Sequence, residues 1–131
     1  MTASTDAGPM VAIRRFVEGF NDNDVNLMLA ACADETTIID DFPPHQWSGR
    51  GATTTWLRDM NEMATTYGMS DPAVILEEPS MAIVSERNAY LVVPIDVRWL
   101  EYGDPAASRG FMAVALRDEA EEWRILTLAW T

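Results

Sequence analysis

Lysine is missing from this sequence, because all nine of its basic residues are arginines. Schiff-base catalysis, attachment of pyridoxal phosphate and the phosphate-binding lysine of a P-loop all depend on a lysine ammonium group. The sequence therefore excludes these three kinds of chemistry.

Cysteine and histidine each occur once, as Cys32 and His45. No disulfide can form within the chain, and neither a thiolate zinc site nor a site of several histidines can be built. A serine–histidine–aspartate triad would have to use His45. A glycine-rich phosphate loop is missing as well, and we expect no metal and no cofactor.

Long apolar segments and an N-terminal basic cluster are also missing. The longest apolar runs, such as residues 89–95, are far short of the roughly 20 residues that a membrane-spanning helix needs. No basic residue precedes Arg14 and no apolar stretch occupies the start of the chain, which argues against a secretory signal. We expect a soluble, cytoplasmic protein.

The 131 residues are 48% hydrophobic and 23% charged, a balance typical of a globular protein. A chain of this length is expected to fold as one domain. Aspartate and glutamate number 21 against the nine arginines, so the net charge is −12. Such a surface repels phosphate backbones and anionic lipids, and we therefore expect neither nucleic acid nor a membrane as a partner.

Three helices are predicted in the first half of the chain, after a flexible stretch over residues 1–8. Pro9 suits a first helical turn, and apolar residues recur at helical spacing from Met10 to Phe20. Asp24 is a good N-cap for a second, shorter helix. A third helix is expected over residues 51–67.

Strands are predicted in the rest of the chain. β-Branched residues predict a strand over residues 36–40, whereas two prolines predict that residues 41–49 are irregular. Pro79 indicates a break in the next β segment. The four later segments are expected at residues 73–85, 89–102, 108–117 and 123–130. Their short connections require antiparallel neighbours, so the sequence predicts an α+β fold.

The predicted strand over residues 110–117 is apolar on both faces. Phe111 and Ala113 lie on one face, and Met112 and Val114 lie on the other. The helices of the same chain can cover only one face of a sheet, so the second face needs another cover. We therefore expect a homodimer formed through the sheet.

The order of these elements resembles the nuclear-transport-factor-2-like superfamily, especially its SnoaL-like and ketosteroid-isomerase-like branch. The resemblance rests on residues 32–40, which lead from the second helix into a strand, on the Pro-Pro loop that closes on residues 47–52, and on the last strand, residues 123–130. It covers residues 9–131 as a single domain. It implies a cone-shaped (cystatin-like) roll, in which three N-terminal helices lie against a strongly bent antiparallel sheet around an apolar cup. Members of the superfamily include isomerases, cyclases, epoxide hydrolases, dehydratases and binding proteins, so the fold alone does not fix the activity.

Asp40 is the first candidate for catalysis. By the resemblance, it occupies the position of the general-base aspartate of the isomerase branch. A carboxylate at the rim of an apolar cup is partly desolvated, which raises its pKa toward that of a useful base. The alternative is that Asp40, or Asp41 beside it, caps the Pro-Pro loop by accepting backbone N–H groups.

The other catalytic groups of the isomerase branch are not present. Phe16 stands where that branch has a tyrosine donor, and residues 112–114 stand where it has a protonated acid. Losing one such donor typically costs about 3 kcal/mol in activation free energy. A different donor, such as Tyr67, Tyr90 or the Trp56 N–H, would have to replace them.

His45 is the second candidate, because its imidazole ordinarily titrates near neutral pH and lies in the predicted loop beside the cup. Asp40 or Asp41 could orient it as a general acid. The alternative is an imidazole that only packs in the loop between Pro44 and Trp47.

Asp96 and Arg98 form a third candidate, because residues two apart on a strand share a face. They could jointly position a water, as epoxide hydrolases of the superfamily do with two acids and an arginine. No second strand acid stands opposite them, since Thr127 and Ala129 occupy that position. We therefore favour a surface or interface ion pair.

The cup is expected to bind a flat, largely apolar ligand through aromatic and small apolar residues, unless these residues simply fill the core. The expected ligand-binding residues are Phe16, Trp47, Trp56, Met60, Trp99 and Ala113. The sequence thus predicts a small-molecule-binding protein, with cofactor-free isomerase or cyclase chemistry by Asp40 as its most concrete activity. The competing prediction is a non-catalytic ligand-binding or interaction module of the same fold.

Overall fold

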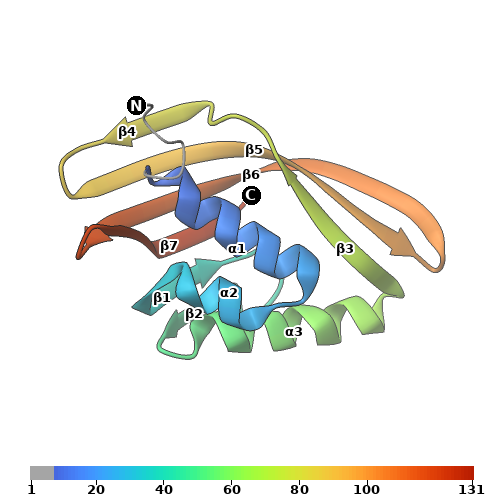
Figure 1. Cartoon of the computed structure of the whole chain (residues 1–131). Helices are drawn as coiled ribbons and strands as arrows, with labels where there is room; N and C mark the ends of the chain where they lie inside the picture. Colours follow the sequence, from blue (N-terminus) through green and yellow to red (C-terminus); the bar gives the residue numbers. More distant parts are fainter. Residues whose placement is uncertain (1–7) are drawn as a thin grey trace.

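The computed structural model describes residues 8–131, in which three helices precede most of a bent sheet (Figure 1). The expected flexible stretch therefore lies outside the described residues except for Gly8. The helices are α1 (Met10–Asp22), α2 (Val25–Ala30) and α3 (Ala52–Thr66). The strands are β1 (Cys32–Ile39), β2 (Gln46–Gly49), β3 (Met69–Leu76), β4 (Met81–Val84), β5 (Asn88–Glu101), β6 (Asp104–Glu119) and β7 (Glu122–Trp130).

The helix boundaries follow the predicted caps. Asn23 ends α1 in the left-handed conformation, with φ of 57°, and its N–H donates to the carbonyl groups of Gly19 and Phe20. The Asp24 side chain accepts a hydrogen bond from the N–H of Leu27 and begins α2. The predictions for all three helices are confirmed.

The sheet has the order β2-β1-β7-β6-β5-β3, with β4 paired to β5. The long strands β5 and β6 pair along their whole length and curve over α3, while α1 lies across the concave face (Figure 1). The predicted segment 73–85 is broken near Pro79, as expected. Its two parts belong to the distinct strands β3 and β4. The predicted α+β architecture, with helices on one face of a bent sheet, is confirmed.

One pairing differs from the antiparallel sheet that we expected. β1 runs parallel to β7, with Ile38 beside Leu128 and Ile39 beside Ala129, so the sheet is mixed. Short connections predict antiparallel neighbours only for consecutive strands, and these two strands are separated by most of the chain. This pairing brings the end of β1 beside the end of β7.

The prediction that residues 41–49 are irregular is wrong for Gln46–Gly49. The prolines lie before this stretch, in a turn with a cis Pro43-Pro44 peptide bond and a positive φ at His45. After this turn the chain pairs back onto β1, with Ile39 opposite Gln46. β6 also begins earlier than predicted, at Asp104, because Pro105 has a sheet neighbour on only one side and tolerates the missing N–H.

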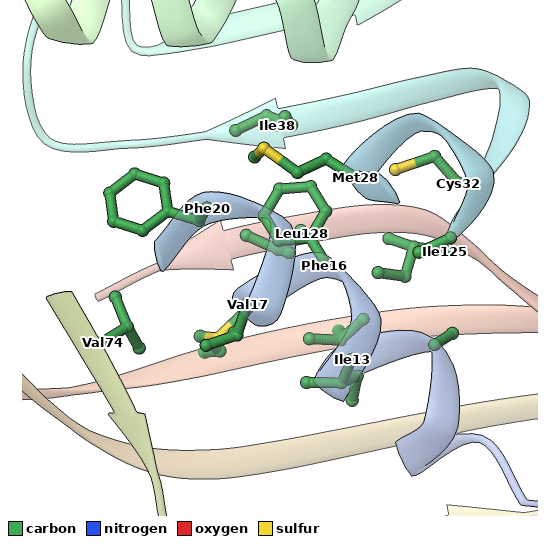
Figure 2. Close-up of a cluster of buried hydrophobic side chains, with 14 of the residues drawn as sticks. Ile13, Phe16, Val17, Phe20, Met28, Cys32, Ile38, Val74, Ile125 and Leu128 are labelled. Atoms are coloured by element: carbon green, nitrogen blue, oxygen red, sulfur yellow. The ribbon is translucent and has the colours of Figure 1, made fainter. Parts of the chain in front are cut away.

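The core lies between α1 and the concave face of the sheet (Figure 2). Ile13, Phe16 and Val17 of α1 are buried in one cluster with Ile125 and Leu128 of β7. Cys32 is buried among them, and burial raises the pKa of its thiol. It acts as a small apolar side chain.

The convex face of the sheet carries an exposed apolar group of side chains, which we call the outer patch. Cross-strand pairs place Ile83 beside Tyr90, and Val92 beside Ala113. Tyr90 and Phe111 are more than two-fifths exposed. The outer patch consists of Met81, Ile83, Tyr90, Val92, Phe111 and Ala113.

Candidate functional site

Asp40 comes directly after β1, where the chain leaves the sheet. Its backbone is held by His45, because the Asp40 N–H donates to the His45 carbonyl at 3.1 Å and His45 Nδ1 lies 3.1 Å from the Asp40 carbonyl oxygen. Ile39 pairs with Ala129 in the parallel ladder, so Asp40 lies at the same level as Trp130 on β7. The half-buried Asp40 side chain is therefore placed between the end of β1 and α3.

Both oxygens of the Asp40 carboxylate accept hydrogen bonds. The Trp56 indole N–H donates to Oδ2 at 2.9 Å, and the Asp41 backbone N–H donates to Oδ1 at 2.7 Å. Burial raises the pKa of Asp40, while these two hydrogen bonds favour the charged form and oppose that rise. The net direction is upward, which is the direction that a general base at neutral pH requires.

A cavity of about 300 Å³ opens beside this carboxylate. Its volume is at the lower end of the range for small-molecule sites, roughly 300–1,000 Å³. Most of its wall is apolar, and the wall comes from helices, strands and the loop after β1. The lining residues are Phe20, Asp40, Asp41, Phe42, Trp56, Met60, Met63, Met69, Pro72, Val74, Ile95, Val97, Trp99, Ser108, Arg109, Gly110, Trp130 and Thr131.

Stacked indole rings form part of this wall. The rings of Trp56 and Trp130 are 5.6 Å apart between centroids and inclined by only 12°. Phe20 contacts both indoles in tilted arrangements. The Trp56 N–H is taken by Asp40, whereas the Trp130 N–H is buried and has no hydrogen-bond partner within residues 8–131.

The structure brings five of the predicted site residues together at the cavity. They are Asp40, Asp41, Trp56, Met60 and Trp99. Their common location supports the expectation that an acidic group and an apolar wall share one site.

The other four predicted site residues do not line the cavity. Phe16 is fully buried in the core, and Trp47 is buried beside Phe42, with its N–H donating to Asp59 at 2.8 Å. Ala113 lies in the outer patch, because it alternates with the buried Met112. His45 is exposed, and its ring lies against the Asp40 backbone carbonyl instead of the carboxylate.

None of the three replacement donors named from the sequence offers the cavity a free N–H or O–H group. The Trp56 N–H is bonded to Asp40, Tyr67 is 60% exposed, and Tyr90 lies in the outer patch. Neither tyrosine lines the cavity. Within residues 112–114, which stand where the isomerase branch has an acid, Met112 and Val114 are fully buried.

Asp96 and Arg98 form an ion pair of 3.0 Å away from the cavity. The Arg98 side chain is 62% exposed, so this pair is screened by solvent. The structure thus agrees with the surface ion pair that we favoured.

Sequence reasoning missed Trp130, Ser108 and the two methionines Met63 and Met69. A period-two pattern in the last strand was a usable signal for Trp130, because Leu128 is fully buried and Trp130 shares its face. No comparable signal existed for Ser108, which lies where β6 was expected to begin. Its position depends on how β5 and β6 curve together.

No group of three or more histidine, cysteine, aspartate or glutamate side chains suited to a metal ion occurs in the described part of the chain. No helix among residues 8–131 is long and apolar enough to cross a membrane.

The fold agrees with comparisons to known proteins. The chain belongs to the SnoaL-like domain family, whose model matches residues 10–128, and hence to the nuclear-transport-factor-2-like superfamily. No curated protein matches it in sequence.

Solved structures of similar fold come from several bacteria. A ketosteroid isomerase-like protein from Erwinia carotovora atroseptica is 15% identical with a TM-score of 0.75, and the match covers 98% of this chain and 96% of that one. A nuclear transport factor 2-like superfamily protein from Salmonella enterica is 14% identical with a TM-score of 0.73, covering 92% and 85%. A protein with a cystatin-like fold from Nostoc punctiforme is 14% identical with a TM-score of 0.68, covering 99% and 92%. At these identities the likeness shows the fold alone.

Proposed function

We propose that this protein binds a small, flat, largely apolar ketone in the cavity and that Asp40 moves a proton between carbon atoms of that ligand. The reaction belongs to the isomerase or cyclase type and needs no cofactor. The observation that carries this proposal is the Asp40 carboxylate, which lines an apolar cavity and has a raised pKa.

The size and the wall of the cavity support this ligand class. Flat apolar molecules pack well against indole rings, and Trp56, Trp99 and Trp130 all line the cavity. Met60, Met63 and Met69 add flexible apolar surface that adapts to different ligand shapes. A volume of about 300 Å³ suits a molecule of about two fused rings.

The proposed chemistry conserves the charge of the protein over one cycle. The Asp40 carboxylate removes a proton from the carbon next to the carbonyl, and the electron pair of that C–H bond moves to the carbonyl oxygen as an enolate. The neutral Asp40 carboxyl group then returns the proton to a ligand carbon, which restores the carbonyl group and the carboxylate. In a cyclase, the enolate carbon instead attacks a second carbonyl carbon of the same ligand, and the proton goes to the oxygen of that group.

Exchange of ligand protons with deuterated water tests this proposal. 2-Tetralone, a flat bicyclic ketone, is incubated with the protein in D2O, and loss of its α-proton signals is followed by NMR. We expect exchange faster than in buffer and at least tenfold slower with Asp40→Asn, since removal of a positioned base costs about 10²–10⁴ in rate. Asp34→Asn, which changes an exposed carboxylate on the same strand β1, is the matched control.

A second candidate function is non-catalytic binding in the same cavity. It is favoured by the apolar residues 112–114, which stand where the isomerase branch has an acid. In that case 2-tetralone binds, but the rate of proton exchange equals that in buffer for both the original protein and Asp40→Asn.

We also propose that two copies associate through the outer patch. Its large side chains Ile83, Tyr90 and Phe111 are exposed and uncharged. The helices of the same chain do not cover them, because these helices lie on the opposite, concave face of the sheet. A second copy of the same patch covers them without bringing charged groups into the centre, which matters for a chain of net charge −12.

A further inference from the structure

The indole N–H of Trp130 is buried and donates to no acceptor among residues 8–131. Nearly all buried N–H groups in proteins are paired, because a donor removed from water without an acceptor is destabilising. Trp130 lines the cavity, so its unpaired N–H is a candidate donor to a ligand bound there.

Trp130 lies next to the proposed base. Ile39 pairs with Ala129, and Asp40 and Trp130 are the next residues along the two segments. Neighbouring strands of a sheet lie roughly 4.8 Å apart. Trp56 connects the two, because it donates its N–H to Asp40 and stacks on Trp130. A ligand that touches the Asp40 carboxylate is therefore also close to the Trp130 ring.

Removal of a proton from the carbon next to a carbonyl group is assisted by a hydrogen-bond donor that lies close to the base. The carbonyl oxygen, which gains the negative charge, is bonded to the carbon beside the one that loses the proton. A donor that is fixed beside the base and shielded from water stabilises this oxygen most effectively. Trp130 lies beside Asp40 and its N–H is buried, so it meets this requirement.

We propose that the Trp130 indole N–H donates a hydrogen bond to the carbonyl oxygen of the ligand while Asp40 removes the neighbouring proton. The inference rests on the proposed function and adds a second catalytic residue, which takes the place of the missing tyrosine and acid donors. It also narrows the ligand class to ketones whose acidic carbon and carbonyl oxygen reach Asp40 and Trp130 together.

The other indoles of the cavity are already engaged. Trp56 donates to Asp40, and the Trp99 N–H lies 3.3 Å from Oε1 of Glu101. The N–H of Trp130 is covered in this structure, so a ligand reaches it only when side chains of the cavity wall move.

A pair of probes isolates this hydrogen bond. 2-Tetralone and tetralin share the same bicyclic body, but only 2-tetralone has a carbonyl oxygen. Their dissociation constants are measured by tryptophan fluorescence for the original protein, for Trp130→Phe and for Trp99→Phe. Trp99→Phe is the matched control, since it also removes an indole from the wall, but one whose N–H is already bonded.

We expect Trp130→Phe to weaken 2-tetralone binding by roughly three- to tenfold more than tetralin binding, the loss expected for one net hydrogen bond. Trp99→Phe is expected to weaken both probes by similar factors. The α-proton exchange of bound 2-tetralone should also slow, by up to about 10² in Trp130→Phe. Equal losses of both probes with Trp130→Phe would overturn the inference.

A second measurement uses the unaltered protein and does not depend on how well Trp130→Phe folds. The sequence contains five tryptophans, so the indole N–H signals are few and can be assigned by NMR. We expect the Trp130 signal to move downfield with 2-tetralone and not with tetralin, and the same response to both probes contradicts the inference. Asp40-dependent exchange without any response of Trp130 refutes this inference alone, whereas failure of the protein to bind either probe refutes the proposed function and this inference with it.

Discussion

Trp56 donates its indole N–H to Oδ2 of Asp40 at 2.9 Å, while its ring stacks on Trp130. This contact joins the acidic group of the cavity to its aromatic wall. It also fixes the orientation of the carboxylate, because the Asp41 N–H holds the other oxygen.

The first prediction concerns the pKa of Asp40. Burial raises this pKa and the Trp56 hydrogen bond lowers it, so Trp56→Phe is expected to raise it further. Carbon-detected NMR titration of the side-chain carboxyl group measures the change. Trp47→Phe is the matched control, because it removes an indole that donates to Asp59 instead of Asp40. This change should leave the pKa of Asp40 unchanged. An Asp40 pKa that is the same in the original protein and in Trp56→Phe would contradict the prediction.

The second prediction concerns the pH dependence of stability. The pKa of Asp40 is raised above its ordinary value of 3.8, so the folded protein keeps a proton on this group at pH values where the unfolded chain has lost it. The contribution of Asp40 to the free energy of unfolding therefore falls as the pH rises from about 3.9 through the raised pKa. Asparagine does not titrate, so the original protein should gain stability relative to Asp40→Asn as the pH is lowered from 7 toward 4.

Urea unfolding of both proteins across this pH range measures the difference. Other carboxyl groups are common to the two proteins and cancel to a first approximation. If the free energy of unfolding of the original protein minus that of Asp40→Asn stays constant or falls as the pH is lowered, the result is incompatible with a raised pKa at Asp40.

The third prediction concerns association through the outer patch. We expect the protein to sediment as a dimer at micromolar concentration and Phe111→Arg to sediment as a monomer, because a charge introduced into the patch is costly to bury in the dimer. Leu29→Arg on α2 is the matched control, since Leu29 is an exposed apolar residue outside the patch. Analytical ultracentrifugation gives the answer, and a monomeric original protein would show that the outer patch has another role.

The fourth prediction concerns Gly68, between α3 and β3. Its φ of 67° is unfavourable for other residues, and an added Cβ atom would collide with the Tyr102 ring. Gly68→Ala is therefore expected to lower the free energy of unfolding by about 1–2 kcal/mol. Gly51→Ala, where an added Cβ meets only Thr55 Oγ1 at 3.8 Å, should cost much less in the same urea experiment.

Much of the fold was predictable because it depends on local patterns. Helical spacing in α1, the Asp24 cap and the break at Pro79 all act within a few residues of the chain. The position of Asp40 after a strand was predictable for the same reason. These expectations are confirmed by the structure.

The rest of the site depends on contacts between distant segments. The parallel pairing of β1 with β7 places Trp130 beside Asp40, and no local pattern in either strand specifies that partner. The hydrogen bond between Trp56 and Asp40 likewise depends on how α3 is docked below the sheet. For this reason the sequence pointed to Asp40 but not to the indole of Trp130 beside it.

The placement of β1 between β2 and β7 has a consequence for synthesis of the chain. β1 leaves the ribosome early, but its parallel partner is the last strand to emerge, so the early segments must wait for the final one before this part of the sheet can close. A product that stops before Glu122 would lack β7 altogether and would leave two long strand edges open, which makes it prone to aggregate. Synthesis of the last strand is therefore needed to cover these strand edges. It is also needed to bring Trp130 beside Asp40.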